Sequence, residues 1–361
     1  MCISLSECAK NKDNNFNLIR FVAATLVLFS HSYALALGTP DAEPLRHTIG
    51  MTWGTIAVDV FFVISGFLVT RSFFERNNIV AFVWARFLRI FPALTIAVLF
   101  CVAIVGYWFT TLSPVEYFYN VETFNFLLKN VTLFFGVEYH LPGVFSQNPY
   151  ANAVNGSLWT LPYEVKMYAC LAIICFGLSH MENKWNTAII TKVFLGLAFL
   201  AVCLNIVFNL ETFMSFKFIH LFSMFFVGSA YYLYRDHIIL RLKWFLFILF
   251  ALIFSLLDKQ LFFIIYCFAL PYIVFYLAYV PTGKIRSFNK AGDYSYGIYI
   301  YAFPVQQSIA ATLQGITVMN MILFSFFITL ILAFLSWHWV EKKSLTLKSR
   351  YVYIEKIFKC K

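Results

Sequence analysis

The stretch that decides the fold is FNLIRFVAATLVLFSHSYALAL, residues 16–37. It is long and apolar enough for one helical crossing of a bilayer, which takes about 20 residues. Two basic side chains, Arg20 and His31, interrupt it. In a helix they lie on one face, about 16 Å apart along the axis. Because ionisable side chains inside a membrane are costly, both are functional candidates.

The composition indicates that the rest of the chain is also mostly apolar and crosses the membrane repeatedly. Of its 361 residues, 61% are hydrophobic and 12% are charged, whereas soluble domains carry about 25% charge. The apolar run that begins at residue 16 is too long for a signal-peptide core, so we expect no cleavable signal. The expected fold class is an all-α, polytopic helical bundle, with a single transmembrane domain over residues 1–361.

Ten membrane spans are predicted from the apolar runs, at residues 16–37, 53–74, 87–108, 157–178, 192–210, 217–235, 243–257, 261–280, 294–314 and 319–340. The apolar stretch 124–135, inside the long loop 109–156, is too short to cross and is predicted to be interfacial or re-entrant. The eight cysteines show no metal-ligand spacing, and none falls in a loop that we place outside. We therefore expect neither a metal site nor disulfides.

The distribution of basic residues fixes the expected orientation. With the N-terminus inside, 22 of the 27 Lys and Arg residues fall on the cytoplasmic side or at its helix ends, as they do in membrane proteins generally. Both termini are therefore expected in the cytoplasm. The net charge of +10 follows from this topology and requires no nucleic-acid partner.

The orientation also predicts depths within the membrane. His31 lies six residues from the outer end of its span, and Asp59 and Glu164 lie six and seven residues from the outer ends of theirs. All three therefore lie about 9–10 Å below the outer surface. Such groups normally pair or face a cavity, so we expect one site that contains an imidazole and two carboxylates.

A second set of polar residues lies on the inner side. Arg86 and Arg89 are spaced i, i+3 and share a face at the expected start of the third span, with Pro92 in its first turns. Together with Arg20 they would form a cationic mouth. Arginine suits phosphate groups because its planar guanidinium binds them through two hydrogen bonds.

Each of these residues also has a purely structural explanation. A helix-flanking arginine often serves only topology, and a long basic side chain can extend to the interface. A lone buried histidine is often a packing residue, and the two carboxylates can form a structural pair with Lys166. His220 and His338, near span ends, are expected to be interfacial. Ser65-Gly66 is expected to be a close helix contact, since the chain has no Gly-x-Ser-x-Gly motif.

Five segments, in order, resemble the signatures of the bacterial acyltransferase family 3 of membrane proteins. They are Asn17 to His31 with its Arg-x10-His spacing, Ala57–Leu68, Phe82–Pro92, Asn155–Tyr168 and Gly292–Tyr299. The resemblance extends over nearly the whole chain. One departure is Tyr301-Ala-Phe-Pro304, which stands where many members have a histidine, so that position is no catalytic candidate here.

The resemblance implies an activity and its partners. Members transfer an acyl group, usually acetyl, from cytoplasmic acyl-CoA to a hydroxyl of a cell-surface or lipid-linked saccharide, such as O-antigen or exopolysaccharide. We accordingly expect acyl-CoA as the donor substrate with no permanently bound cofactor, a saccharide acceptor, and a multi-pass location in a bacterial cytoplasmic membrane. The chain resembles the stand-alone members, without a fused esterase-like domain, and its oligomeric state stays open.

The resemblance and the depths together suggest roles for the polar residues. Arg20, Arg86 and Arg89 would hold the phosphates of the donor. His31 would act as general base or be transiently acylated. Asp59 or Glu164 would orient the imidazole, and the sequence does not decide between them.

The stabiliser of the reaction's oxyanion also stays open. Candidates for this role or for acceptor contacts are Ser157, Trp159 and Tyr168. The main alternative to an enzyme is a transporter or flippase of a lipid-linked saccharide, which midmembrane charges would also suit. A membrane sensor without chemistry is a second alternative. We see neither the inverted repeats nor the broken helices that would favour a transporter.

Overall fold

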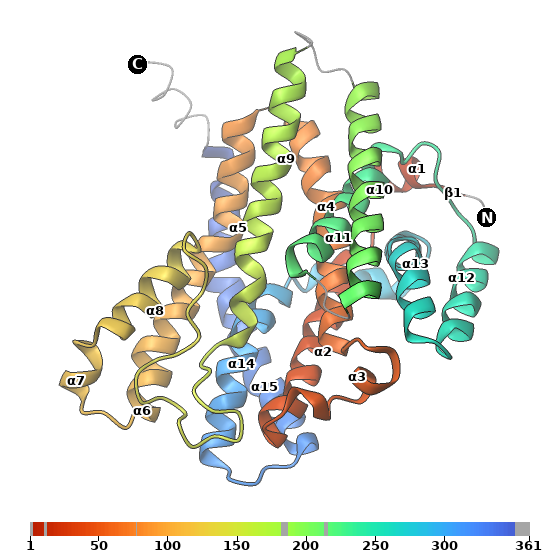
Figure 1. The fold of residues 1–361 in the computed structure, drawn as a ribbon. Helices are drawn as coiled ribbons and strands as arrows, with labels where there is room; N and C mark the ends of the chain where they lie inside the picture. The colour runs from red at the N-terminus through yellow and green to blue at the C-terminus, as the bar shows by residue number, and fades with distance from the viewer. Residues whose placement is uncertain (1–2, 11–12, 77, 182–186, 213–215, 351–361) are drawn as a thin grey trace.

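The computed structural model describes residues 3–10, 13–76, 78–181, 187–212 and 216–350, and its long helices run side by side as a bundle (Figure 1). These helices are α2 Phe16–Leu37, α4 Trp53–Arg76, α5 Ile79–Phe100, α9 Leu161–Met181, α10 Thr187–Thr212, α11 Lys217–Leu233, α12 Leu242–Ser255, α13 Lys259–Tyr279, α14 Ser295–Thr312 and α15 Val318–Ser336. Shorter helices are α1 Leu5–Lys10, α3 Pro44–Ile49, α6 Tyr107–Phe109, α7 Pro114–Phe118, α8 Val121–Thr132 and α16 Lys342–Thr346. Two-residue strands, β1 Ile3–Ser4 and β2 Ile239–Leu240, pair antiparallel.

The prediction of an all-α, polytopic membrane protein is confirmed. Within the described ranges, seven helices are long and apolar enough to cross a membrane. Three predicted spans correspond to helices outside that set: α11 has 17 residues, α12 has 14 and α14 has 18. The count of ten therefore stays a prediction, as does the cytoplasmic placement of the termini, where residues 1–2 and 351–361 lie outside the described part.

The third span begins earlier than the sequence suggested. Helix α5 starts at Ile79, where the side chain of Asn78 accepts a hydrogen bond from the Ala81 N–H. Helical backbone then continues through a π-helical turn, Cys101–Gly106, to Phe109. The prediction that Arg86 and Pro92 stand in the first turns was therefore wrong, because the apolar residues after Asn78 already belong to the helix. Arg86 lies about two turns inside it.

Helix α4 lies against α11 at very short range. A Cβ atom added to Gly66 would lie 1.9 Å from the carbonyl oxygen of Phe225, and one added to Gly228 would lie 2.1 Å from that of Val63. Two glycines thus allow the two backbones to touch, as small residues do in membrane helices. The prediction that Ser65-Gly66 is a close helix contact is confirmed at Gly66.

Helix α14 is bonded to the segment that leads into α9. Pro304 lies inside α14 and has no N–H for the carbonyl of Ile300. The side-chain amide of Asn155 donates to that carbonyl at 2.9 Å. Asn155 directly precedes the 3-10 turn Gly156–Thr160, from which α9 begins. The proline in α14 is thus matched by a partner from a distant loop.

The stretch predicted to be interfacial or re-entrant forms α8, a 12-residue helix that packs against α5. Thr123, Phe126 and Asn130 are buried on one face, and Phe124 and Leu128 are exposed on the other. A helix of this length cannot cross a bilayer. The chain then runs without regular structure over most of residues 133–155, with an isolated bridge between His140 and Ala153.

Candidate active site

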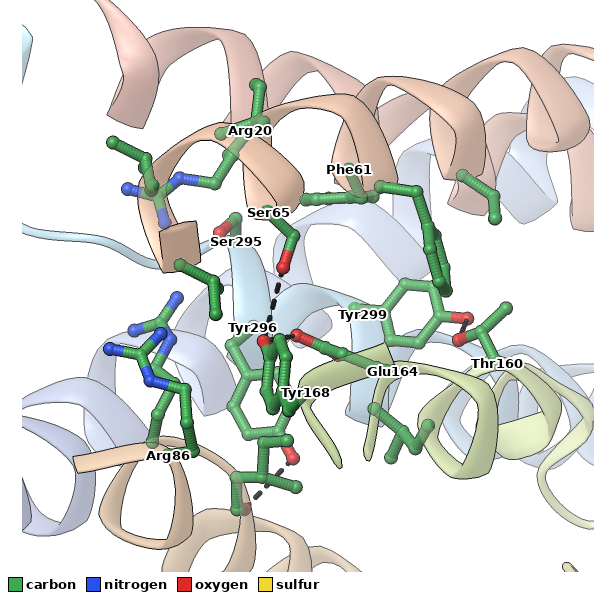
Figure 2. Close-up of a pocket in the computed structure, with 18 residues that line it drawn as sticks. Arg20, Phe61, Ser65, Arg86, Thr160, Glu164, Tyr168, Ser295, Tyr296 and Tyr299 are labelled. Atoms are coloured by element: carbon green, nitrogen blue, oxygen red, sulfur yellow. Dashed lines mark hydrogen bonds between the residues drawn. The ribbon is translucent and has the colours of Figure 1, made fainter. Parts of the chain in front are cut away.

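A narrow cavity of about 130 Å³ lies between α2, α4, α5, α9 and α14. We call it the arginine cavity; its polar lining includes Arg20, Ser65, Arg86, Arg89, Thr160, Glu164, Tyr168, Ser295, Tyr296 and Tyr299. Figure 2 shows Arg20 and Arg86 toward one end and Tyr299 toward the other, with Glu164 and Tyr168 between them. The structure therefore brings the three predicted arginines together with one of the two predicted carboxylates.

Asp293, just before α14, neutralises part of this charge. Its Oδ2 lies 2.6 Å from Nη2 of Arg89 and 3.3 Å from Nη1 of Arg20. Arg89 is also 3.9 Å from a carboxylate oxygen of Glu341. Burial alone would raise the pKa of Asp293, but the charges of Arg20 and Arg89 outweigh it and hold the pKa well below its usual range.

Arg86 differs from the other two arginines because it makes no ion pair with any residue that the structure describes. Its guanidinium carbon lies 5.7 Å from the ring centroid of Tyr168 and 6.0 Å from that of Phe82. Its Nε is buried without a hydrogen-bond partner. Aromatic faces attract a cation but leave this N–H without an acceptor, so Arg86 is available to an anionic ligand.

Glu164 receives a hydrogen bond from Tyr168, one turn further along α9. Ser65 Oγ lies 3.2 Å from the same phenolic oxygen. Because the single phenolic hydrogen goes to Glu164, Ser65 is the donor to Tyr168. Lys166 is exposed and lies over the ring of Tyr163, with 5.3 Å from its Nζ to the ring centroid, and so does not neutralise Glu164.

A wider cavity of about 780 Å³ contains the other half of the predicted site. We call it the histidine cavity because His31 lines it; further lining residues include Glu43, Arg46, Tyr139, His140, Tyr150, Trp159, Lys217 and Phe303. The His31 ring meets that of Phe303 edge to face, with centroids 5.3 Å apart. Its Nδ1 is buried and has no hydrogen-bond partner in the described part of the chain.

Two side chains, Val58 on α4 and Tyr299 on α14, line both cavities. They are the only residues common to the two linings among those described. The Tyr299 hydroxyl donates to the Ser157 carbonyl at 2.6 Å and lies 2.5 Å from Oγ1 of Thr160. We call these two side chains, Val58 and Tyr299, the shared wall, because they lie between the arginine cavity and the histidine cavity.

Asp59 is not part of either cavity, which corrects the prediction that it shares a site with His31. Its Oδ1 lies 2.7 Å from Nε2 of His220, and its Oδ2 accepts a hydrogen bond from Tyr266 at 2.8 Å. The reason is helical rotation: one step along α4 turns a side chain by about 100°. Val58 therefore faces the cavities, while Asp59 faces α11 and α13.

His220 was predicted to be interfacial, and this was wrong. It is buried, and its Nδ1 lies 3.1 Å from the side chain of Asn205 on α10. Asp59, His220, Tyr266 and Asn205 thus form a buried network across α4, α10, α11 and α13. Both carboxylate oxygens and both ring nitrogens have partners, which is the condition under which polar groups are tolerated in such surroundings.

The other predicted contacts divide between the two cavities. Trp159 lines the histidine cavity, and Tyr168 lines the arginine cavity with Glu164. Ser157 lines neither, and its Oγ is buried without a partner among the described residues. Neither Asp59 nor Glu164 is hydrogen-bonded to His31, so the orienting carboxylate expected from the sequence is not seen.

Sequence reasoning missed Asp293, Glu341 and Tyr299. Asp293 and Tyr299 stand in the segment Gly292–Tyr299, which supported the resemblance but received no role. Asp293 lies one residue before its predicted span, as the candidate Arg86 does. Its position on the expected inner side, level with the arginines, was a usable signal. Tyr299 carried no such signal, because tyrosines are common throughout this chain.

Comparison with known proteins supports an enzyme of a definite class. Residues 13–338 match the family described as acyltransferase domain. The chain is 31% identical over 352 residues to an O-acetyl transferase of Shigella phage Sf6, covering 94% of this chain and 98% of that protein. It is 28% identical over 329 residues to Nodulation protein 10 of Rhizobium leguminosarum bv. viciae, covering 85% and 86%. No solved structure matches.

The helical bundle and these matches define a multi-pass membrane acyltransferase. The chain belongs to acyltransferase family 3, the family that its sequence motifs resemble, and it is an O-acyltransferase.

Proposed function

We propose that this enzyme transfers an acetyl group from acetyl-CoA to a hydroxyl of a cell-surface or lipid-linked saccharide. The observation that supports this most directly is the arrangement of two cavities on either side of one wall, a cationic one and one with an available imidazole. The acetyl group is chosen because the phage relative is named an O-acetyl transferase. The saccharide comes from the family resemblance.

The arginine cavity is the proposed donor site. CoA carries several phosphates, and guanidinium groups bind phosphate through paired hydrogen bonds. Arg86 has no competing ion pair with any described residue, so it would bind the phosphates directly. Arg20 and Arg89 would contact both Asp293 and the ligand. Since basic residues gather on the cytoplasmic side of membrane proteins, this cavity would open toward the cytoplasm of a bacterial inner membrane.

Glu164 would contact the pantetheine arm of the donor. It lies between the arginines and the shared wall (Figure 2) and keeps one carboxylate oxygen beyond the one that Tyr168 bonds. Amide N–H groups of a pantetheine arm are suitable donors to such an oxygen. This role replaces the one in which Glu164 would orient His31, since the two residues line different cavities.

The histidine cavity is the proposed acceptor site. It is wide, and it combines aromatic faces with polar side chains, as sites for polar small molecules often do. His31 would take the proton of an acceptor hydroxyl while the oxygen of that hydroxyl forms a bond to the carbonyl carbon of the thioester. The carbon–sulfur bond then breaks, and the proton passes to the departing thiolate. Trp159, the one predicted oxyanion contact that lines this cavity, would donate its indole N–H.

The test uses purified protein, acetyl-CoA labelled in the acetyl group, and saccharide from a bacterial envelope. Transfer of label to saccharide as an alkali-labile ester supports the proposal. The His31→Ala variant should bind acetyl-CoA normally and transfer no label, while the control His47→Ala, at an exposed position in α3, should behave as wild type. Full transfer by His31→Ala would refute the role of the imidazole. Movement of an unmodified saccharide across vesicles without ester formation would favour the transporter instead.

A further inference from the structure

We propose that Val58 and Tyr299 form a gate, and that the thioester reaches the acceptor only when this shared wall opens. The inference rests on the proposed function, because it assigns the two cavities to donor and acceptor. It adds a positioning role for two residues that touch neither the phosphates nor the imidazole.

The first argument is placement. Arg20, Arg86 and Glu164 line one cavity and His31 lines the other. A reaction that uses both sets must bring the carbon of the thioester past the side chains between them. Val58 and Tyr299 are the described residues that border both spaces, and each belongs to a different helix. The passage of the acyl group therefore runs between these two side chains.

The second argument is how Tyr299 is held. Its hydroxyl is bonded to the Ser157 carbonyl and to Thr160, both in the 3-10 turn before α9, and its ring meets that of Phe61 at 6.0 Å between centroids. Side-chain hydrogen bonds of this kind fix one orientation of a ring but break at modest cost. Val58, in contrast, has no polar atom to hold it and limits the opening only by its volume.

The third argument is protection of the donor. The histidine cavity is six times as large as the arginine cavity by volume, about 780 against 130 Å³, and its lining includes residues of exposed loops. Water in it would hydrolyse a thioester that stood permanently beside His31. A closed wall excludes that side reaction until the acceptor is in place, a function that active-site closure serves in other enzymes.

The experiment compares four variants in detergent or vesicles. Val58→Trp narrows the passage, Tyr299→Ala widens it, and Tyr299→Phe removes only the hydroxyl. The control Val207→Trp makes the same change as the first on α10, at a position that is 45% exposed and outside both cavities. Three quantities are measured for each: the dissociation constant for acetyl-CoA, the rate of transfer to saccharide, and the rate of acetyl-CoA hydrolysis to acetate and CoA without acceptor.

If the shared wall is a gate, its variants should change the rate of transfer and the rate of hydrolysis differently. At saturating acetyl-CoA, Val58→Trp should lose transfer roughly 100-fold, the scale of a misplaced reacting group, whereas Val207→Trp should retain transfer. Tyr299→Ala should raise hydrolysis several-fold and lower transfer. Tyr299→Phe should raise the ratio of hydrolysis to transfer less strongly. A residue that only supported the fold would lower transfer and hydrolysis together.

Contrary results would separate the gate from the proposed function. Transfer by Val58→Trp equal to that of Val207→Trp at saturating acetyl-CoA overturns the gate alone. If Val58→Trp does not fold or does not bind acetyl-CoA, unchanged hydrolysis by Tyr299→Ala overturns the gate instead. A wild-type protein that neither binds acetyl-CoA nor transfers its acetyl group overturns the proposed function and the gate with it.

Discussion

Arg89 and Asp293 are 204 positions apart in the chain, yet a guanidinium nitrogen of one lies 2.6 Å from a carboxylate oxygen of the other. The same oxygen is 3.3 Å from Arg20. One carboxylate therefore joins α2, α5 and the start of α14, and it offsets the repulsion between two of the three arginines in the cavity. The arrangement of the arginines in the cavity thus depends on Asp293, which lies just before α14.

Replacing Asp293 by Asn should lower stability. The change leaves Arg20 and Arg89 without their shared anion, and breaking a buried ion pair from one side costs about 3–5 kcal/mol. Because each arginine keeps about 20% of its side chain exposed, we expect the lower end of that range. Thermal unfolding in detergent measures it, with the exposed Asp236→Asn as control. Equal Tm values for the two variants would contradict this expectation.

The same pair predicts how stability depends on pH. Because the folded protein holds the pKa of Asp293 below its usual range, the stabilisation is complete above the unfolded value of about 3.9. It is lost only as the pH falls through the lower, folded value. The difference in Tm between wild type and Asp293→Asn should therefore stay constant between pH 7 and 5. A difference that shrinks across that interval would show that Asp293 is not held ionised.

Arg86 should matter more for donor affinity than for stability. Its guanidinium has no ion pair to lose with the described residues, while a hydrogen bond to a charged group contributes about 1.5–3 kcal/mol. Arg86→Gln should therefore weaken acetyl-CoA binding roughly 10- to 100-fold with little change in Tm. Calorimetric titration measures this, with Arg235→Gln, outside both cavities, as control. Unchanged affinity in Arg86→Gln would remove it from the donor site.

Lys348 should make donor binding sensitive to alkaline pH. Burial, together with the positive charges of Arg86 and Arg89, lowers its pKa to about 8. Trp84 donates to the Leu347 carbonyl at 3.1 Å and so holds this segment against α5. A bound polyanion favours the protonated amine, so acetyl-CoA affinity should fall as the pH rises through about 8.

The Lys348→Arg variant tests this directly, because a guanidinium stays protonated in that range. Its affinity for acetyl-CoA should remain constant where that of the wild type falls. Lys343→Arg, at an exposed position in α16, should retain the pH dependence of the wild type. If Lys348→Arg follows the wild-type curve, the titrating group is another one.

Asp59 should act on stability and not on chemistry. Asp59→Asn weakens the buried contacts to His220 and Tyr266, and leaving a buried polar group without its hydrogen-bond partner costs about 1–3 kcal/mol. We expect a lower Tm for Asp59→Asn and for His220→Gln, with a smaller than additive effect in the double variant. Turnover per folded molecule should stay at the wild-type level. Lost turnover at an unchanged Tm would contradict the placement of Asp59 outside the site.

The sequence predicted which segments are helical far better than which way their polar side chains point. Apolar run lengths correctly indicated helices for the predicted spans, and the arginine spacing correctly placed Arg86 and Arg89 on one face. Asp59 and His31 were predicted at one depth, but depth does not define direction around a helix. A single step between Val58 and Asp59 decides whether a side chain faces the cavities or α11.

Pairing across the bundle was the other property that the sequence could not supply. The partners of Asp59 come from residues 220 and 266, and Asp293 pairs with Arg20 and Arg89. Such contacts depend on which helices are neighbours. A chain with many apolar helices can pack them in many arrangements that bury similar amounts of apolar surface. The polar contacts select among these arrangements, so they become visible only in the folded protein.

The glycine contact between α4 and α11 has a consequence for the shared wall. Gly66 and Gly228 place the two backbones against each other, and Asp59 bonds to His220 across the same junction. The helix that carries Val58 is therefore anchored along one side and has no room to shift toward α11. Tyr299 belongs to a helix that contains Pro304, so the Ile300 carbonyl has no helical N–H partner and is bonded instead by the side chain of Asn155. Because this one side-chain hydrogen bond breaks at modest cost, α14 deforms there more readily than α4. The wall consequently has one stationary half and one deformable half, and the direction of any opening is determined before a substrate arrives.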